Sequence, residues 1–299
     1  MPPIQTNVPL APYTTFGVGG VAEQFAVAKT EADLAGLITE ANTRGWPIRI
    51  LGGGSNVIVP DAGVPGLVIH NQITGFDAAV GEREVRITVG AGVVWDEFVA
   101  TTVQRGWWGL ENLSHIPGTV GATPVQNVGA YGVEVAEHIA AVHVYNTTTG
   151  KSEQLSVAEC QFGYRDSIFK TTKGAQYVIT AVTFNLSRQP APRLSYPDLA
   201  QHFATGTPPE QGAIRDAVIA IRATKFPDWH TVGTAGSFFK NPILSQPEAA
   251  QLAATYPALP QFAVGDGAIK VPLGWILDKV CDLRGHCRGP LCLSQTQAL

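Results

Sequence analysis

The chain has 299 residues and a formal net charge of −4; 45% of its residues are hydrophobic and 15% are charged, against about 25% in ordinary soluble domains. This length buries a full core in one to three packed units, and the composition excludes a disordered protein and a basic nucleic-acid binder. Residues 112–133, one of the two longest stretches without Asp, Glu, Lys or Arg, hold four glycines and two prolines, so no membrane span is predicted. The first residues lack a basic region followed by an apolar one, and we expect a cytoplasmic protein.

The first half of the chain alternates predicted strands and helices. Residues 23–28 and 48–51 are predicted strands, and between them Thr30 is expected to cap a helix that Gly45 ends. Apolar side chains recur on one face of this helix, at Leu34, Leu37, Ile38 and Ala41. The pattern indicates a βαβ-like start.

The later elements suggest two domains. A second helix, ending near Gly106, is predicted to carry Trp95, Phe98 and Val99 on one face, and residues 139–145 and 177–186 alternate like strands. The composition changes at residues 187–197, where SRQPAPRLSYP is typical of a linker. Helical patterns follow around residues 213–225, 248–256 and 273–280. We therefore predict a boundary near residue 188.

The cysteines give little support for a metal site. Cys160, Cys281, Cys287 and Cys292 form no Cys-x-x-Cys pair. The last three lie near His286, so a zinc site is one interpretation, and reduced, mostly buried thiols are the other and simpler one. The remaining histidines have no ligand spacing, and we expect no metal.

Two uncharged, glycine-rich segments are candidate binding loops. Residues 51–56, LGGGSN, follow a predicted strand, and glycines there let backbone N–H groups approach a phosphate. The spacing is neither that of a Rossmann fingerprint nor that of a P-loop, and a plain tight turn is the alternative. Residues 116–132, IPGTVGATPVQNVGAYG, mix small side chains with amides and hydroxyls. Long structureless loops in compact domains are usually functional, so this segment is a candidate binding loop as well. Together the two loops suggest one extended dinucleotide bound between them, although an irregular loop stays the alternative for the second.

Charged and polar residues elsewhere suggest where chemistry takes place. Arg165, within FGYRDSIFK, has a fixed fork for a carboxylate or a developing oxyanion; the alternative is a surface turn in which Asp166 caps a helix. Arg222 and Lys225 lie on one helix face, either as ordinary cations at a helix C-terminus or as ligands of substrate phosphates. Ser237 follows a small-residue turn but lacks the Gly-x-Ser-x-Gly elbow of serine hydrolases.

Taken in order, these segments resemble the UDP-N-acetylenolpyruvoylglucosamine reductase family of bacterial peptidoglycan precursor synthesis. The matching motifs are TTFG at residues 14–17, LGGGSN, GLENL at 109–113, IPGTVGATPVQNVGAYG, CQFGYRDSIFK at 160–170, RATKFPD at 222–228 and GTAGSFFKNP at 233–242. The resemblance implies an α+β fold, with an FAD-binding domain of the vanillyl-alcohol-oxidase (PCMH) type at residues 12–187. A substrate-binding domain at residues 188–299 would follow.

The resemblance also implies the cofactors and the site. NADPH would reduce FAD, which would pass hydride to the enolpyruvyl group of a UDP-sugar, with Arg165 as the enolate stabiliser and Ser237 as the proton donor. The implied substrate-binding residues are Tyr196, Arg222, Lys225, Asn241 and Gln297. The implied FAD-binding residues are Gly52, Gly54, Ser55, Asn56, Pro117, Gly118, Gly121, Thr123, Gln126, Asn127, Gly129, Ala130 and Tyr131.

The sequence departs from the family pattern near its end. The family has a catalytic glutamate beyond the Gln-Ala-Leu motif, and this sequence ends at that motif, residues 297–299. We therefore expect reduced turnover, and a flavin-binding or nucleotide-binding fragment of the enzyme is the alternative function. A flavin oxidase that uses O2 fits less well, because Arg165, Lys225 and Asn241 suit an anionic nucleotide-sugar. We expect a monomer with no nucleic-acid or membrane partner.

Overall fold

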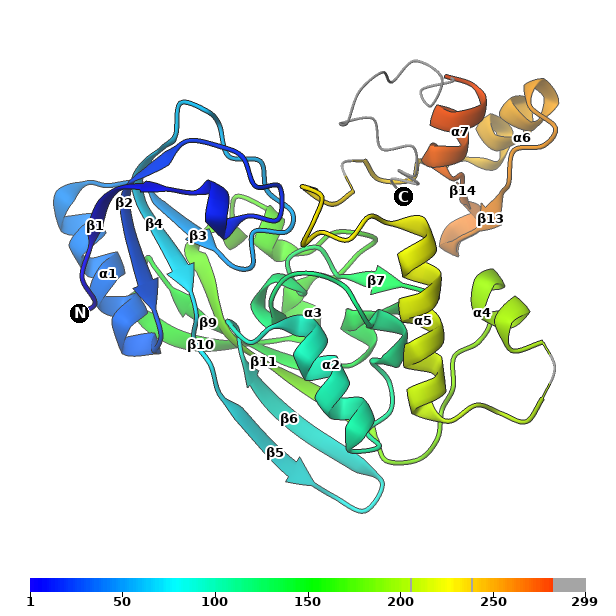
Figure 1. The fold of residues 1–299 in the computed structure, drawn as a ribbon, viewed down its shortest axis with the longest axis horizontal. Helices are drawn as coiled ribbons and strands as arrows, with labels where there is room; N and C mark the ends of the chain where they lie inside the picture. Colours follow the sequence, from blue (N-terminus) through cyan, green and yellow to red (C-terminus); the bar gives the residue numbers. More distant parts are fainter. Residues whose placement is uncertain (205, 238, 282–299) are drawn as a thin grey trace. The chain divides into compact units, whose positions relative to one another are not determined.

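The computed structural model describes residues 1–204, 206–237 and 239–281, and it divides the chain into two compact units, Met1–Arg222 and Ala223–Leu299 (Figure 1). Residues 188–222, which are predicted above to belong to the second domain, carry helix α4 (Pro197–His202) and most of α5 (Gln211–Lys225). Leu199 of α4 and Ile214 of α5 pack against Trp108 and Tyr131 within the first unit. The predicted domain boundary near residue 188 stays a prediction.

A four-stranded sheet begins the first unit. Its order is β1-β2-β4-β3, formed by β1 (Gln5–Pro9), β2 (Val21–Ala28), β4 (Val64–Asn71) and β3 (Ile48–Leu51). β1 is antiparallel to β2, whereas β2 and β3 both run parallel to β4. The predicted βαβ start is therefore present with β4 inserted between its two strands, which no local pattern around residues 23–51 encodes.

Helix α1 (Glu31–Arg44) covers this sheet as its sequence predicts (Figure 1). The Thr30 hydroxyl accepts from the Asp33 N–H while the Asp33 carboxylate accepts from the Thr30 N–H, a reciprocal capping box. Gly45 ends the helix in the left-handed region at φ 66°. The predicted apolar face is buried against the strands, and its members are Leu34, Leu37, Ile38 and Ala41.

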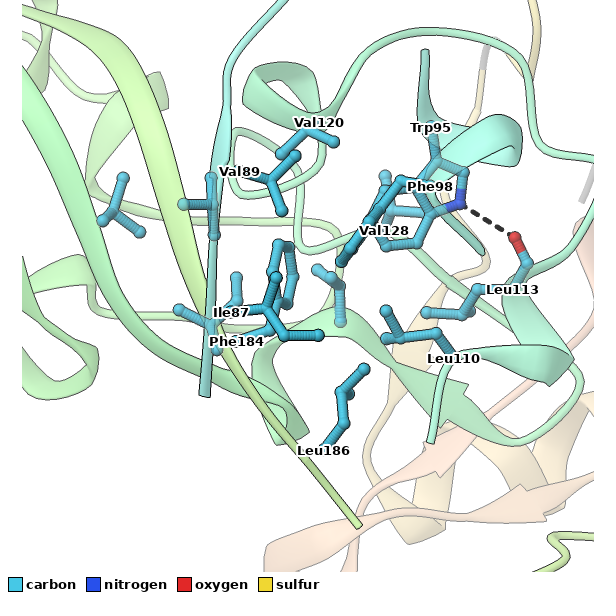
Figure 2. Packing of buried hydrophobic residues seen from close by; sticks show 14 of the residues in the cluster. Ile87, Val89, Trp95, Phe98, Leu110, Leu113, Val120, Val128, Phe184 and Leu186 are labelled. Carbon is cyan, nitrogen blue, oxygen red and sulfur yellow. Dashed lines mark hydrogen bonds between the residues drawn. The ribbon is translucent and has the colours of Figure 1, made fainter. Parts of the chain in front are cut away.

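A second, wholly antiparallel sheet holds the largest core. Its order is β10-β9-β11-β6-β5, formed by β10 (Lys151–Ser156), β9 (Ile139–Asn146), β11 (Tyr177–Ser187), β6 (Glu84–Gly90) and β5 (Phe76–Val80). Helix α2 (Trp95–Gln104) buries Trp95, Phe98 and Val99 against this sheet, as its spacing predicts. Figure 2 shows this packing, with the Trp95 indole N–H donating to the Leu113 carbonyl at 2.9 Å.

Short elements complete the first unit. Its remaining strands and α-helix are β7 (Gly129–Ala130), β8 (Val133–Glu134) and α3 (Val157–Cys160). The 3-10 helices are η1 (Ala11–Tyr13), η2 (Glu111–Leu113), η3 (Val120–Ala122), η4 (Val135–Glu137), η5 (Ile168–Lys170) and η6 (Gly174–Gln176).

The described residues of the second unit form short strands and helices. Its three-stranded sheet has the order β12-β14-β13, formed by β12 (Ile243–Leu244), β14 (Ile269–Lys270) and β13 (Phe262–Ala263). Helices α6 (Gln246–Thr255) and α7 (Leu273–Lys279) match the predicted helical patterns, and η7 (Gly265–Gly267) precedes β14. Sheets with interspersed helices confirm the predicted α+β class.

Three sequence predictions concern membrane-spanning helices, metal ligands and the state of the cysteines. No helix in the described part of the chain is long and apolar enough to cross a membrane. Among residues 1–204, 206–237 and 239–281, no three His, Cys, Asp or Glu side chains gather as metal ligands would. Cys160 is a buried free thiol and Cys281 is exposed, whereas Cys287, Cys292 and His286 lie outside the described residues.

Candidate active site

The two glycine-rich loops lie in direct contact within the first unit. Residues 52–56 follow β3, and residues 117–132 lie between η2 and β8 and contain η3 and β7. The Ser55 hydroxyl donates to the Pro117 carbonyl at 3.2 Å, and the Asn56 amide donates to the Gln126 side-chain oxygen at 3.2 Å. Two uncharged, glycine-rich segments about 60 residues apart in sequence are thus in contact.

Close backbone approach explains the glycines of the first loop. A Cβ at Gly53 would lie 2.9 Å from the Gly118 Cα, so the two loops can approach this closely only without that atom. Gly54 has φ 62°, and a Cβ there would fall on the Tyr13 carbonyl oxygen. Gly52 would place its Cβ 2.9 Å from the Thr119 hydroxyl. The triple glycine therefore serves close packing within the protein, and its predicted role in binding a ligand stays a prediction.

The first loop also presents a set of donors that suits an anion. Within the described part of the chain, the backbone N–H groups of Gly53, Gly54, Ser55 and Asn56 donate to no protein acceptor. Consecutive N–H groups in such a turn form a concave site for phosphate oxygens. The donor set fits the pyrophosphate of a dinucleotide such as FAD.

The first residue of α2 and the segment just before the helix hold the start of the second loop. The Trp95 N–H donates to the Gly118 carbonyl at 3.0 Å, and the Val120 N–H donates to the Val93 carbonyl at 2.9 Å. A Cβ at Gly121 would lie 2.5 Å from that of Ala91, so only glycine allows this contact. The loop is irregular in conformation but fixed in place.

Buried side chains give the second loop its shape. The Asn127 amide donates to Glu134 at 2.7 Å and to the Gly163 carbonyl at 3.1 Å, and its oxygen accepts from the Ala136 N–H at 3.1 Å. The Thr123 hydroxyl donates to the Val120 carbonyl at 2.8 Å. The side chains of these two predicted FAD-binding residues are thus engaged by the protein itself.

Arg165 lies against the end of the second loop. Its guanidinium donates to the Gly129 carbonyl at 2.5 Å and to the Asn127 carbonyl at 3.5 Å. Ser167, rather than Asp166, caps the following helix η5, and its hydroxyl also donates to the Val125 carbonyl at 2.6 Å. The turn is therefore attached to the candidate cofactor loop, and the alternative of an Asp166-capped surface turn is wrong.

Two predicted substrate residues also contact this loop. The Tyr196 ring meets the Tyr131 ring edge-on at 5.2 Å between centroids, and it is 39% exposed. Arg222 donates from Nε to the His115 carbonyl at 2.9 Å, and its side chain is also hydrogen-bonded to the Tyr131 hydroxyl. Burial raises the pKa of Tyr131 to about 12, so this hydroxyl stays protonated at neutral pH.

The other predicted site residues belong to the second unit. Lys225 is the last residue of α5, and Ser237 is exposed after Gly236, which has φ 76°. The Asn241 side-chain oxygen accepts from the Leu273 N–H at 3.0 Å, at the first residue of α7. Gln297 lies outside the described residues. The predicted approach of Ser237 to Arg165 joins the two units and stays a prediction.

Sequence reasoning missed three residues beside the candidate cofactor loop. Asp96, His115 and Arg215 form a hydrogen-bonded chain that links α2, the loop and α5. One signal was available, because Arg215 precedes Arg222 by two helical turns and so shares its face of the predicted helix.

Three comparisons place this geometry among known proteins. The family model described as "FAD binding domain" matches residues 22–156. The UDP-N-acetylenolpyruvoylglucosamine reductase of Cupriavidus pinatubonensis is 42% identical over 97% of this chain and 86% of its own length. The enzyme of that name from Escherichia coli O157:H7 is 40% identical over 98% of this chain and 84% of its own length. The crystal structure of the Thermus caldophilus enzyme (MurB) covers 96% of both chains with a TM-score of 0.62 and 28% identity.

Proposed function

Because the chain belongs to the UDP-N-acetylenolpyruvoylglucosamine reductase family, we propose that it reduces UDP-N-acetylglucosamine enolpyruvate to UDP-N-acetylmuramate, with NADPH as reductant and FAD as cofactor. The observation that carries the proposal is the contact between residues 52–56 and 117–132. Both segments lie within the matched FAD-binding region. This reaction belongs to peptidoglycan precursor synthesis.

The first task of the chain is to bind the cofactor without a cation. The N–H groups of residues 53–56, which donate to no acceptor among the described residues, would hold its phosphates, because backbone donors in a turn act as fixed partial positive charges. Bound there, FAD would supply the transfer of hydride from NADPH to the vinyl carbon of the substrate. Gly129, Ala130 and Tyr131 would lie on the cofactor surface nearest Arg165.

Arg165 would stabilise the charge that develops on the substrate. Hydride addition to the vinyl carbon moves the electron pair of the double bond toward the substrate carboxylate, which becomes an enolate. A guanidinium has five N–H donors, and the bonds to the Gly129 and Asn127 carbonyls leave other donors for this oxygen. These bonds hold the fork before the reaction, so little reorganisation is needed as charge builds.

Ser237 would complete the reduction by giving its hydroxyl proton to the carbon next to the site of hydride addition. A neutral hydroxyl is a sufficient acid because the acceptor is a carbanion-like enolate. Tyr196, Arg222, Lys225, Asn241 and Gln297 would bind the anionic nucleotide-sugar. A monomer in the cytoplasm, where UDP-sugars and NADPH are made, is part of the proposal.

The experiment follows the colour of the purified protein. We expect bound FAD, bleaching of its visible absorbance by NADPH under anaerobic conditions, and recovery of the colour only when the enolpyruvyl substrate is added. Arg165→Met and Ser237→Ala are expected to bleach normally and to recover at least about a hundredfold more slowly, the cost typical of a lost oxyanion donor for Arg165 and of a lost general acid for Ser237. A protein without FAD refutes the proposal. Bleaching without recovery in the unaltered chain supports the fragment alternative.

A further inference from the structure

We propose that Asp96 and Arg215 are positioning residues for the cofactor: their ion pair, between α2 and α5, fixes His115 and through it the start of the loop of residues 116–132. The inference rests on the proposed function, because it concerns the same FAD site. It goes beyond that function by giving a role to two residues that lie outside both glycine-rich loops.

The ion pair has the geometry of a strong interaction. Arg215 Nη1 and Nη2 donate to Asp96 Oδ1 and Oδ2 at 2.7 and 2.8 Å, a bidentate fork. The two side chains are only 15% and 25% exposed. Bidentate, partly buried pairs are stronger and better oriented than exposed ones, and this pair joins residues 119 positions apart in sequence.

The carboxylate of this pair also binds the backbone of His115. Asp96 Oδ1 accepts from the His115 N–H at 2.5 Å, and the His115 carbonyl accepts from Arg222 Nε at 2.9 Å. Both polar backbone groups of His115 are thus held by side chains from α2 and α5. His115 has φ 57°, a left-handed conformation that costs a residue with a Cβ free energy and persists only where contacts enforce it.

The electrostatics agree with this geometry. Burial alone would raise the pKa of the Asp96 carboxyl, but the hydrogen bonds from Arg215 and from the His115 N–H outweigh it and leave that pKa below its usual value. The carboxylate is therefore charged at neutral pH, so it can accept from both partners at once.

His115 lies only two residues from the contact between the two loops. The Pro117 carbonyl accepts from the Ser55 hydroxyl, and Gly118 faces Gly53. The first turn of α2 holds this segment on both sides of His115, through the Trp95 indole bond to Leu113 (Figure 2) and the Trp95 N–H bond to Gly118. A rotation at residue 115 would therefore displace Pro117 and open the surface that faces the cofactor.

The test compares FAD binding in matched variants. Arg215→Leu keeps much of the apolar stem but removes the fork, and we expect FAD to bind about tenfold more weakly, equal to about 1.4 kcal/mol. The dissociation constant is measured from the flavin fluorescence released on serial dilution of the holoprotein, together with the visible circular dichroism of the bound flavin. Arg215→Lys, which can donate to one carboxylate oxygen, should restore part of the loss. Arg44→Leu is the control, because it cuts the exposed Arg44–Glu40 pair of α1 and should change neither signal.

A double-mutant cycle isolates the role of His115. His115→Gly removes the cost of the left-handed conformation, so in the Arg215→Leu background it should recover most of the lost affinity, whereas alone it should change affinity less than about threefold. Equal losses with and without glycine at residue 115 would overturn the proposal, as would wild-type affinity and dichroism in Arg215→Leu. Asp96→Asn, which keeps an acceptor for the His115 N–H but loses the charge, should weaken FAD binding about threefold. If Arg215→Leu does not fold, unchanged FAD affinity in Asp96→Asn would overturn the proposal. An unaltered protein that binds no FAD would instead refute the proposed function.

Discussion

Replacing Gly53 by alanine is the sharpest perturbation of the candidate cofactor surface. The new Cβ would lie 2.9 Å from the Gly118 Cα and 3.2 Å from its carbonyl carbon. Carbon atoms in proteins pack at about 3.5–4.0 Å, so the two loops must separate by roughly half an ångström or more. Gly53 does not have a positive φ, so alanine adds no backbone strain, and the effect measures the contact between the loops alone.

The magnitude follows from the cost of overpacking. Atoms forced into a packed contact cost about 1–3 kcal/mol, and the neighbour here is backbone, which cannot rotate away as a side chain does. If the loops relax apart in the free protein and must be drawn together to bind FAD, the dissociation constant rises about fivefold to 150-fold. The Ser55–Pro117 hydrogen bond would lengthen at the same time.

The assay measures flavin release on dilution and the temperature of unfolding for Gly53→Ala and for Gly36→Ala. Gly36 lies inside α1, where a Cβ would meet Met1 Cγ at an ordinary 3.6 Å. That control should bind FAD normally and gain about 0.5–1 kcal/mol of stability from a better helix former. Wild-type FAD affinity in Gly53→Ala would refute the reasoning, because it would mean that the close approach of the two loops plays no part in binding.

Three further predictions concern stability. Thr30→Ala removes the capping box of α1 and should lower the free energy of unfolding by about 1 kcal/mol in urea titrations, whereas Thr30→Ser should retain it. Trp95→Phe leaves the buried Leu113 carbonyl without its donor and should cost about 1–3 kcal/mol; an unchanged denaturation midpoint would contradict this. Burial lowers the pKa of His138 below 6.5, so the unfolded state binds the proton first and stability falls as the pH drops below 6.5. His138→Gln should flatten that fall, and an equally steep fall in the variant would show that other groups cause it.

Secondary structure could be predicted where the residues that determine it are close together in the sequence. The Thr30 cap, the Gly45 stop and the apolar face of α1 are encoded within 16 residues, and the structure has all three. The insertion of β4 between β2 and β3 was not predictable, because hydrophobic periodicity says which face of a strand is buried but not which strand is its neighbour. The Asp96–Arg215 pair was not predictable, because the spacing of Arg215 from Arg222 points to a shared helix face but not to a partner 119 positions away.

Backbone strain gives an independent reason to locate function at the second loop. Six non-glycine residues in the described part of the chain have positive φ, and His115, Asn127, Tyr131 and Arg165 among them lie in this loop or contact it. Each is held by named bonds: Asp96 and Arg222 hold His115, Glu134 holds Asn127, the Asn112 amide donates to the Tyr131 carbonyl, and Arg165 donates to Gly129. Strained conformations persist only where surrounding contacts over-determine them, and they gather where a ligand must meet a preformed surface. Four of the six such residues therefore lie in or beside the loop that we propose as the cofactor surface, which supports that proposal on grounds other than its glycines.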